Sequence, residues 1–337
     1  MISKNYNRHQ YVDRVSGTVK DETLYHDRII NNIYSSMREN SSILYRLVTS
    51  GRITDILAYI NYDMPMGKRI SGGSSFLKKS GIDTTEFLDP LESLDTSRKF
   101  FERKIKYTEC RPMPDGSGVI TAPADSRMLI GSFDETSFIF LKEKFFGFEE
   151  ILGNKPEWHF KFRNGKYAVF RLTPEKYHYN HVPVSGIVSD YYVVDGDFNS
   201  CNPGAVAAID MAYSKNKRCI TIIDTDVPGG TGSGFVAMIE VAALMIGVVQ
   251  QCYSENGYDN PGVIKKGMFI KMGSVKSLFR PGSSVDVLLF EKGRVMFSDD
   301  LVENSQRRDV ESRFTAHFKR ALVETDVQVR MEIARIK

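Results

Sequence analysis

The bond between Gly282 and Ser283, which comes just before the hydrophobic run 285–290, has the composition of a self-cleavage point. Glycine has no Cβ, so its backbone can adopt strained dihedral angles that expose its carbonyl to attack by the next hydroxyl. A histidine that takes the proton of Ser283 Oγ, oriented by a carboxylate, would activate this attack. His181 and Asp125 are the candidates. The alternative interpretation is an ordinary turn that leads into a strand, which residues 281–284 would also form.

The order Asp125, His181, Ser283 does not define a triad by itself, because a triad is recognised by geometry rather than by sequence order. A chain of 337 residues contains such a trio by chance. The segments around the three residues (121–126, 177–183 and 280–284) nevertheless place each of them at the edge of a predicted element.

Composition limits the classes of function. The chain is 42% hydrophobic and 26% charged, enough for one sizeable core with a smaller helical extension. Its net charge is only +3 and the charges are interspersed, which argues against nucleic-acid binding and a disordered acidic tail. We therefore expect small-molecule partners.

The four cysteines are Cys110, Cys201, Cys219 and Cys252, far apart and without a CxxC pair. The N-terminus has no secretory signal, so the pattern favours a reducing cytoplasm over a disulfide framework. We expect no metal site from these cysteines.

The sequence pattern changes once along the chain. Residues from about 20 to 105 have helical spacing, and short β-rich runs separated by Gly, Pro, Asn and Asp follow from Pro112. The fold class predicted is α+β: a helical N-terminal region over 1–105 and a mainly antiparallel β catalytic domain with flanking helices over 106–337. The predicted strands are 118–121, 128–130, 167–172, 219–223 and 285–297, the last folded as a hairpin that turns at Gly293.

The apolar segment 234–249 resembles a membrane span in composition only. It carries Glu240 and Gly247, and its apolar runs are shorter than the roughly 20 residues that a spanning helix needs. We interpret it as two buried strands, or a strand and a turn.

Several motifs together resemble the phosphatidylserine decarboxylase family from about Phe100 to Phe297. The segment 98–105 with Arg111-Pro112 resembles the family's FFxRxL...RP, and 122–125 its SPxDG. Residues 172–186 are similar to LxPxDYHRxHxPxxG, and 216–218 to NER or NKR. The last motif, KGxF...GS(T/S)V, is matched by 266–269 and 281–285. The chain departs from the family pattern at Ser126, Ser284 and Arg280-Pro281.

The resemblance implies maturation by serinolysis between Gly282 and Ser283, which would give a β chain of residues 1–282 and an α chain of residues 283–337. By position in the motifs, Asp125, His181 and Ser283 would serve self-cleavage. Ser283 would become a covalent pyruvoyl group, and His178 matches the histidine implicated in decarboxylation. A structural role for His178, holding Tyr177 or a backbone carbonyl, is the alternative.

A pyruvoyl carbonyl condenses with a substrate amine to an imine that withdraws the electrons released as CO2 leaves. Neither pyridoxal phosphate nor a metal is then required. The function expected is conversion of phosphatidylserine to phosphatidylethanolamine, by a cytoplasmic enzyme with peripheral contact at the cytoplasmic membrane face and a dimeric state. The alternatives are a soluble decarboxylase of a free amino acid or other small amine-bearing acid, and a non-catalytic relative that binds lipid or protein. The polar residues 1–40 and the weakly amphipathic segment 53–60 leave the choice between lipid and soluble substrate open.

Overall fold

The computed structural model describes residues 8–23, 82–133, 147–197, 203, 212–242, 249–282, 284–318 and 320–337. Ser283 and residues 24–81, which include most of the predicted helical region, lie outside these ranges, so the expectations about them stay predictions.

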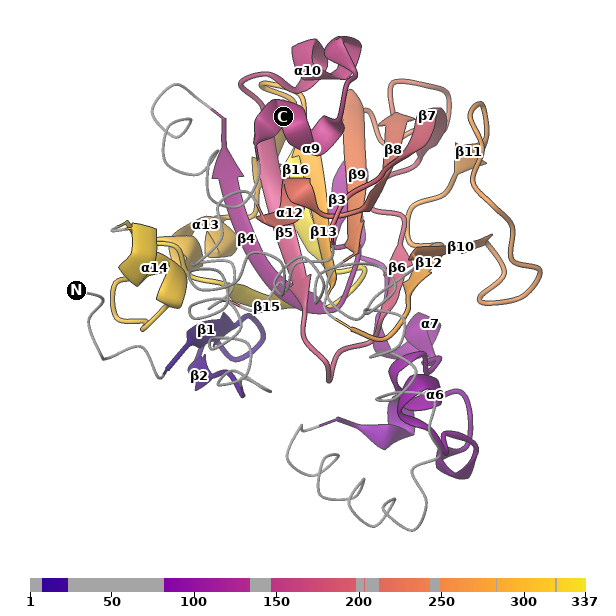
Figure 1. Ribbon diagram of the computed structural model, residues 1–337, viewed down its shortest axis with the longest axis vertical. Helices are drawn as coiled ribbons and strands as arrows, with labels where there is room; N and C mark the ends of the chain where they lie inside the picture. The colour runs from indigo at the N-terminus through magenta and orange to yellow at the C-terminus, as the bar shows by residue number, and fades with distance from the viewer. Residues whose placement is uncertain are drawn as a thin grey trace.

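Strands outnumber helices in the described residues, and the helices are short (Figure 1). The strands are β1 (Gln10–Asp13), β2 (Val19–Asp21), β3 (Val119–Thr121), β4 (Ser126–Ser132), β5 (Lys166–Leu172), β6 (Tyr179–His181), β7 (Gly186–Val194), β8 (Arg218–Asp224), β9 (Phe235–Ala242), β10 (Val249–Ser254), β11 (Phe269–Ile270), β12 (Val275–Phe279), β13 (Ser284–Phe290), β14 (Val295–Phe297), β15 (Thr325–Val327) and β16 (Glu332–Ile336). The α-helices are α6 (Ser97–Phe101), α7 (Tyr107–Cys110), α9 (Phe148–Leu152), α10 (Pro156–Phe162), α12 (Ala212–Lys215), α13 (Asp299–Ser305) and α14 (Arg313–Phe318), with 3-10 turns η4 (Thr84–Glu86) and η5 (Leu91–Ser93).

A ten-stranded sheet forms the centre of the molecule, in the order β11-β7-β8-β9-β13-β5-β4-β15-β1-β2. Its pairs are antiparallel except for β1 with β15, which are parallel. Two three-stranded sheets, β10-β12-β6 and β14-β16-β3, accompany it. The predicted α+β class with a mainly antiparallel sheet is confirmed.

Strand β13 has neighbours on both sides along its whole length, from Ser284 to Phe290, with β9 on one side and β5 on the other. All seven of its residues are buried. Its alternate side chains enter two different cores, because successive residues of a strand point to opposite faces. Val287 lies in the core covered by α9 and α10, whereas Leu288 lies in the core that also contains Ile120 of β3 and Ala334 of β16.

The predicted hairpin over 285–297 is wrong. Both of its strands exist, and Gly293 has the positive φ of a turn residue (77°), but β14 pairs with β16. The physical reason is that β9 and β5 already occupy both edges of β13, so no backbone groups of β13 remain for a third strand.

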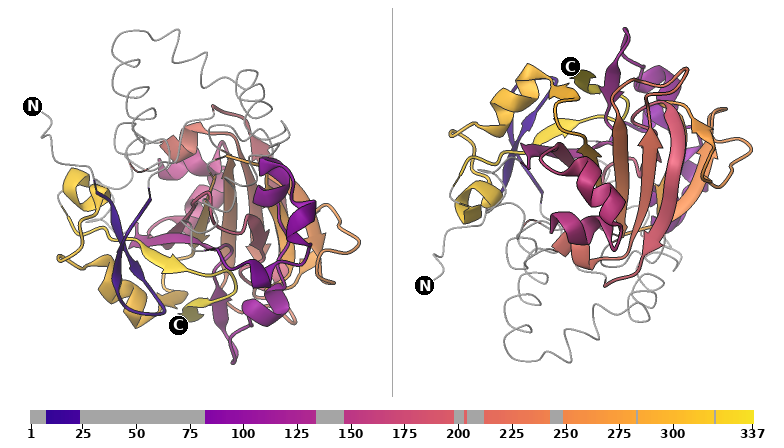
Figure 2. Two further views of the ribbon diagram at one scale, coloured as in Figure 1. Left: turned by 90° about the horizontal axis from the view of Figure 1, so that it is seen from below. Right: turned by 90° about the horizontal axis from the view of Figure 1, so that it is seen from above.

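Residues 10–21, inside the predicted helical range 1–105, form the β-hairpin β1–β2 instead. Figure 2 shows this hairpin beside the C-terminal helices α13 and α14, far from it in sequence. The hairpin joins the C-terminal part of the chain through the parallel pairing of β1 with β15, which places Val12 opposite Thr325. Residues 10–21 therefore belong to the large sheet.

The apolar segment 234–249 begins as predicted with a buried strand, β9, and its last residue begins β10. Residues 243–248 between them lie outside the described residues. Among the helices that the structure describes, none has the length and apolar character needed to cross a membrane.

Candidate active site

Asp125 lies in the connection between β3 and β4 and is 4% exposed. Its carboxylate accepts a forked pair of bonds from Arg111, Nε to Oδ1 at 3.1 Å and Nη2 to Oδ2 at 2.9 Å, and a third from the Val329 amide at 2.8 Å. Burial opposes ionisation, but Arg111 outweighs it and keeps the pKa of Asp125 below its usual value. Asp125 is therefore held as a carboxylate.

His181, the last residue of β6, is completely buried. Its Nδ1 lies 2.9 Å from the carbonyl oxygen of Gly273, which can only accept, so Nδ1 carries the proton in the neutral ring. Nε2 then has the lone pair and lies 3.0 Å from the hydroxyl of Tyr177. Burial lowers the pKa of His181 to about 4, which leaves the ring neutral at pH 7 with a basic nitrogen at Nε2.

Two tyrosine hydroxyls extend this network. Tyr177 Oη lies 2.8 Å from Tyr258 Oη, which meets both the carbonyl (2.9 Å) and the amide (3.1 Å) of Ile105. Each hydroxyl has a single proton, so the two can point either toward His181 or away from it. In the second arrangement Tyr258 donates to the Ile105 carbonyl, Tyr177 donates to Tyr258, and Nε2 of His181 is left free to accept another proton.

His178 is also completely buried, and its ring stacks on Phe101 with centroids 3.5 Å apart. Within the described residues, neither ring nitrogen has a hydrogen-bond partner. Burial, with a smaller contribution from the charge of Arg103, lowers the pKa of His178 well below its usual value. The alternative role considered for it, holding Tyr177 or a backbone carbonyl, stays a prediction.

The backbone at Gly282 has φ of 148°, a conformation that only glycine adopts without strain. This confirms the backbone expectation at that position. Before it, the guanidinium of Arg280 bonds both carboxylate oxygens of Glu102 at 2.9 and 3.0 Å. The departure from the family pattern at Arg280 thus ties the approach to the predicted cleavage point to the end of α6.

The fold brings Asp125 and His181 together, since the His181 amide donates to the Pro123 carbonyl at 2.7 Å. Their side chains are not hydrogen-bonded to each other: among described residues Asp125 binds Arg111, and His181 binds Gly273 and Tyr177. The relation of either side chain to Ser283 stays a prediction.

Sequence reasoning missed the partners Arg111, Tyr177 and Tyr258. Arg111 and Tyr177 belong to the motifs that carry the family resemblance, which was a usable signal. Tyr258 lies in a loop after β10, and its place beside Tyr177 arises only from the fold.

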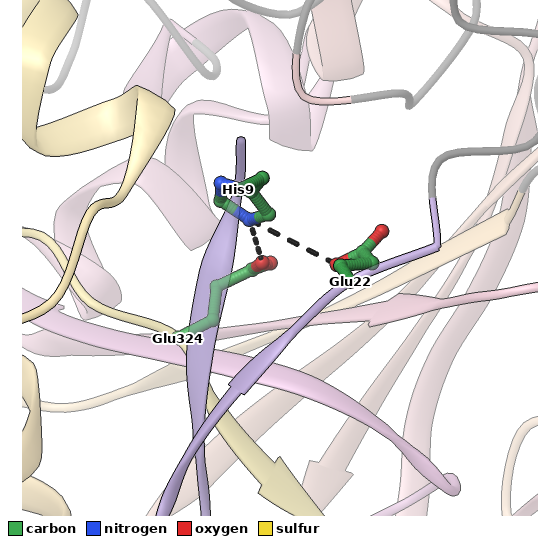
Figure 3. Close-up of side chains that lie close together, drawn as sticks. All are labelled: His9, Glu22 and Glu324. Carbon is green, nitrogen blue, oxygen red and sulfur yellow. Dashed lines mark hydrogen bonds and ion pairs between the residues drawn. The ribbon is translucent and has the colours of Figure 1, made fainter. Parts of the chain in front are cut away.

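A second buried cluster, His9, Glu22 and Glu324, joins the start of the chain to its end (Figure 3). His9 Nε2 lies 2.7 Å from Glu324, and Arg171 bonds both glutamates, at 2.5 Å to Glu22 and 2.6 Å to Glu324. The three side chains have donor types and spacing suited to a metal. However, the guanidinium already supplies the positive charge, so we interpret the cluster as an ion network.

A cavity of about 550 Å³ opens beside α9 and α10, lined by residues that include Glu149, His159, Asp197 and Arg218. None of the predicted site residues lines it. The cavity is therefore separate from the predicted site residues.

Comparison with known proteins gives the family. The family model described as phosphatidylserine decarboxylase matches residues 98–316, more than half of the chain. The chain belongs to the phosphatidylserine decarboxylase family. It is accordingly a carboxy-lyase.

Among family members, the phosphatidylserine decarboxylase proenzyme of Fusobacterium nucleatum subsp. nucleatum is 28% identical over 312 residues, which cover 92% of this chain and 96% of that protein. The proenzyme of Chlamydia trachomatis serovar D is 32% identical over 67% of this chain and 70% of its own length. Proenzyme 2 of rice (Oryza sativa subsp. japonica) is 31% identical over 86% of this chain but only 45% of the rice protein. The sequence-based recognition of the family is confirmed.

Proposed function

We propose that the chain is a self-processing decarboxylase that converts phosphatidylserine to phosphatidylethanolamine and CO2 by means of a pyruvoyl group made from Ser283. The observation that carries the proposal is the state of His181: a buried neutral imidazole whose Nδ1 is fixed by Gly273 and whose Nε2 is basic. The names of the family relatives, which are proenzymes acting on phosphatidylserine, supply the substrate.

In the proposed maturation, Nε2 of His181 takes the hydroxyl proton of Ser283 as Oγ attacks the carbonyl carbon of Gly282. The C–N bond breaks, the proton passes to the freed nitrogen, and an ester joins the two residues. Loss of the Cα proton of residue 283 with expulsion of the Gly282 carboxylate, followed by hydrolysis with one water, leaves a keto group and releases ammonia. The permissive backbone at Gly282 supports the first step, because it lets the carbonyl present itself to attack.

The residues present fit a pyruvoyl group at position 283, since two buried histidines and a positive-φ glycine stand on the adjoining segments. Such a group, when present, supplies an electron sink for the electrons released with CO2. Among the residues that the structure describes, the ring nitrogens of His178 have no hydrogen-bond partner, and the ring is buried and neutral. The carboxylate of a substrate bound beside His178 would raise the pKa of this histidine. The ring could then hold a proton and deliver it once the carboxylate is lost as CO2.

The decisive experiment is an intact mass spectrum of the wild-type chain beside Ser283→Ala, with Ser284→Ala as the matched control. We expect the wild-type and Ser284→Ala proteins to give chains 1–282 and 283–337, the second without a free N-terminal amine. Ser283→Ala should stay a single chain of 38.2 kDa. A single uncut chain in all three would contradict the proposal.

We further propose that the enzyme is cytoplasmic, dimeric, and reaches its lipid at the cytoplasmic membrane face. The support is the substrate itself, because a diacyl lipid resides in the bilayer. Flotation with liposomes that contain phosphatidylserine should carry the protein upward, and liposomes of neutral lipid alone should carry less of it. Protein that remains at the bottom of both gradients, yet decarboxylates free serine, would instead support the soluble alternative. Native mass spectrometry would give the oligomeric state.

A further inference from the structure

A polar cluster lies in the interior beside β13. It contains Glu240 of β9, Lys276 of β12 and Asp286 of β13, all three with no exposed surface. The register places Asp286 directly opposite Glu240, on neighbouring strands of the large sheet. Neither proposed catalytic histidine bonds any of these three residues.

Each carboxylate oxygen of Glu240 accepts two hydrogen bonds. Its Oε2 accepts from Lys276 Nζ at 2.6 Å and from Gln251 Nε2 at 3.0 Å. Its Oε1 accepts from the Ser277 hydroxyl and from Asn180 Nδ2, the latter at 3.4 Å. Lys276 and Glu240 thus form a compensated buried ion pair.

Asp286 is the opposite case. Within the described residues, neither of its carboxyl oxygens has a hydrogen-bond partner, and neither does Asn180 Oδ1 or Ser284 Oγ. Ser284 shares a face of β13 with Asp286, because the two are two positions apart along the strand. Asn180 reaches the same cluster through its bonds to Glu240 and Ser277. Buried polar atoms without partners cost free energy, so a concentration of them indicates a missing partner.

The character of that partner follows from chemistry and charge. A carboxylate oxygen, an amide oxygen and a hydroxyl oxygen all accept hydrogen bonds. The cluster holds two carboxyl groups and a single ammonium, so it lacks one positive charge when both are ionised. Burial and the nearby charge of Glu240 raise the pKa of Asp286 well above its usual value, which favours the neutral, protonated carboxyl in the free protein.

We propose that Asp286, with Asn180 Oδ1 and Ser284 Oγ, forms a subsite for an ammonium group. The group that binds has N–H donors and one positive charge, and it replaces the proton of Asp286. Its source depends on the proposed function: either the primary amine of the substrate or the ammonia that maturation sets free. Asp286 lies three residues after Ser283, so both sources arise near it along the chain.

The first experiment needs neither maturation nor activity. The full chain with Ser283→Ala is unfolded by heat in ammonium chloride and, at equal ionic strength, in potassium or tetramethylammonium chloride. At ten times its dissociation constant, ammonium should raise the Tm by about 2 °C. Adding Asp286→Asn should remove this increase, whereas adding Asp115→Asn at an exposed position should preserve it. No ammonium-specific increase, or an equal one in potassium chloride, would overturn the proposal.

Proton release gives an independent readout. Below the pKa of Asp286, binding should weaken about tenfold for each unit that the pH falls, because one proton must leave as the cation enters. Glu240 and Lys276 are the charged groups that act on Asp286, and they form an ion pair with each other. Asp286→Asn should abolish the slope, and a slope that persists in this variant would overturn the assignment to Asp286.

Two further measurements on the otherwise native chain distinguish the sources. If the substrate amine binds, Asp286→Asn should raise KM at least tenfold and change kcat less than twofold, with normal maturation. If maturation ammonia binds, the variant should release ammonia and form chain 283–337 more slowly, with an unchanged KM. An uncut wild-type chain would refute the proposed function alone, since ammonium binding to the Ser283→Ala protein is judged separately.

Discussion

The two nitrogens of His181 have different surroundings, and this difference defines its chemistry. Gly273 fixes the proton on Nδ1, and the hydroxyls of Tyr177 and Tyr258 can turn toward or away from Nε2. Tyr107 also contacts the ring edge-on, at 4.6 Å between centroids. The imidazole is therefore positioned by its own surroundings rather than by a bond from Asp125.

The low pKa of His181 predicts the pH dependence of self-cleavage. The neutral ring is the base and the protonated ring is inactive, so the rate should be constant from about pH 8 to 5 and decline as the pH falls through about 4. Mass spectrometry of freshly translated chain, sampled over time at each pH, measures this rate. His181→Ala should abolish cleavage at every pH. A midpoint near 6.5 would contradict the assigned state of the ring.

The Asp125 carboxylate predicts a stability effect at Arg111. Arg111→Met would leave Asp125 buried without its charge partner, which costs about 3–5 kcal/mol in the free energy of unfolding. Urea denaturation of the Ser283→Ala chain measures this change without interference from cleavage. Arg335→Met, which removes an exposed guanidinium that also forks onto one carboxylate, Glu332, is the matched control and should have little effect. Equal losses of unfolding free energy in both variants would contradict the prediction that burial makes the Arg111–Asp125 pair important for stability.

At the scale of elements, hairpin β1–β2 and strand β15 are joined by more than their backbone bonds. Glu324 precedes β15, Glu22 follows β2, and Arg171 of β5 bonds both. Burial opposes ionisation of the two carboxyls, yet Arg171 lowers the pKa of each below its usual value. The network thus connects three strands of the large sheet through charges that water does not screen.

The same network predicts acid sensitivity. The pKa values of Glu22 and Glu324 are lower in the folded chain, so their stabilisation is complete above about pH 4.5, the unfolded value, and is lost as the pH falls toward the folded values. Urea midpoints of the Ser283→Ala chain between pH 7 and 3 should show this decline. Glu324→Gln should be less stable at pH 7 and have a shallower decline, whereas Glu332→Gln, on the surface, should follow the parent protein. A parallel decline in Glu324→Gln would refute the assignment.

At the scale of the whole molecule, cleavage after Gly282 would distribute the strands of the large sheet between two chains but leave the pairing of those strands in place. The segment 284–337 supplies β13, which lies between β9 and β5, and β15, which lies between β4 and β1. It also supplies β14 and β16, which pair with each other, and β16 pairs in addition with β3. The pairings of β13, β15 and β16 with β9, β5, β4, β1 and β3 all cross from one product chain to the other.

We therefore expect the cleaved chains to remain associated. Native mass spectrometry of the processed protein should give both chains in one particle, and the smaller chain should separate only in denaturant at concentrations that unfold the sheet. The uncut Ser283→Ala protein provides the reference denaturation curve. Release of chain 283–337 in native buffer would contradict this topology.

Sequence analysis predicted local features well, because local chemistry determines them. The strands β3, β4, β5, β8 and β13 were found from their alternating or apolar patterns, and Gly282 has the backbone freedom expected of it. Motif spacing also located Asp125, His178 and His181 in connections and a short strand at the edges of the core. Hairpin β1–β2 was missed because its strands are four and three residues long, too short for a clear period.

By itself, the sequence determined the family, the mainly antiparallel class and the residues available for chemistry, because these depend on residue types and their spacing along the chain. Only the tertiary structure decided the pairing of β14 with β16, the tyrosine partners of His181, and the placement of Asp286 opposite Glu240. The physical reason is that these contacts join residues that are distant along the chain. Such contacts depend on which strand edges are already occupied and which polar groups burial leaves without water, and no local pattern encodes either.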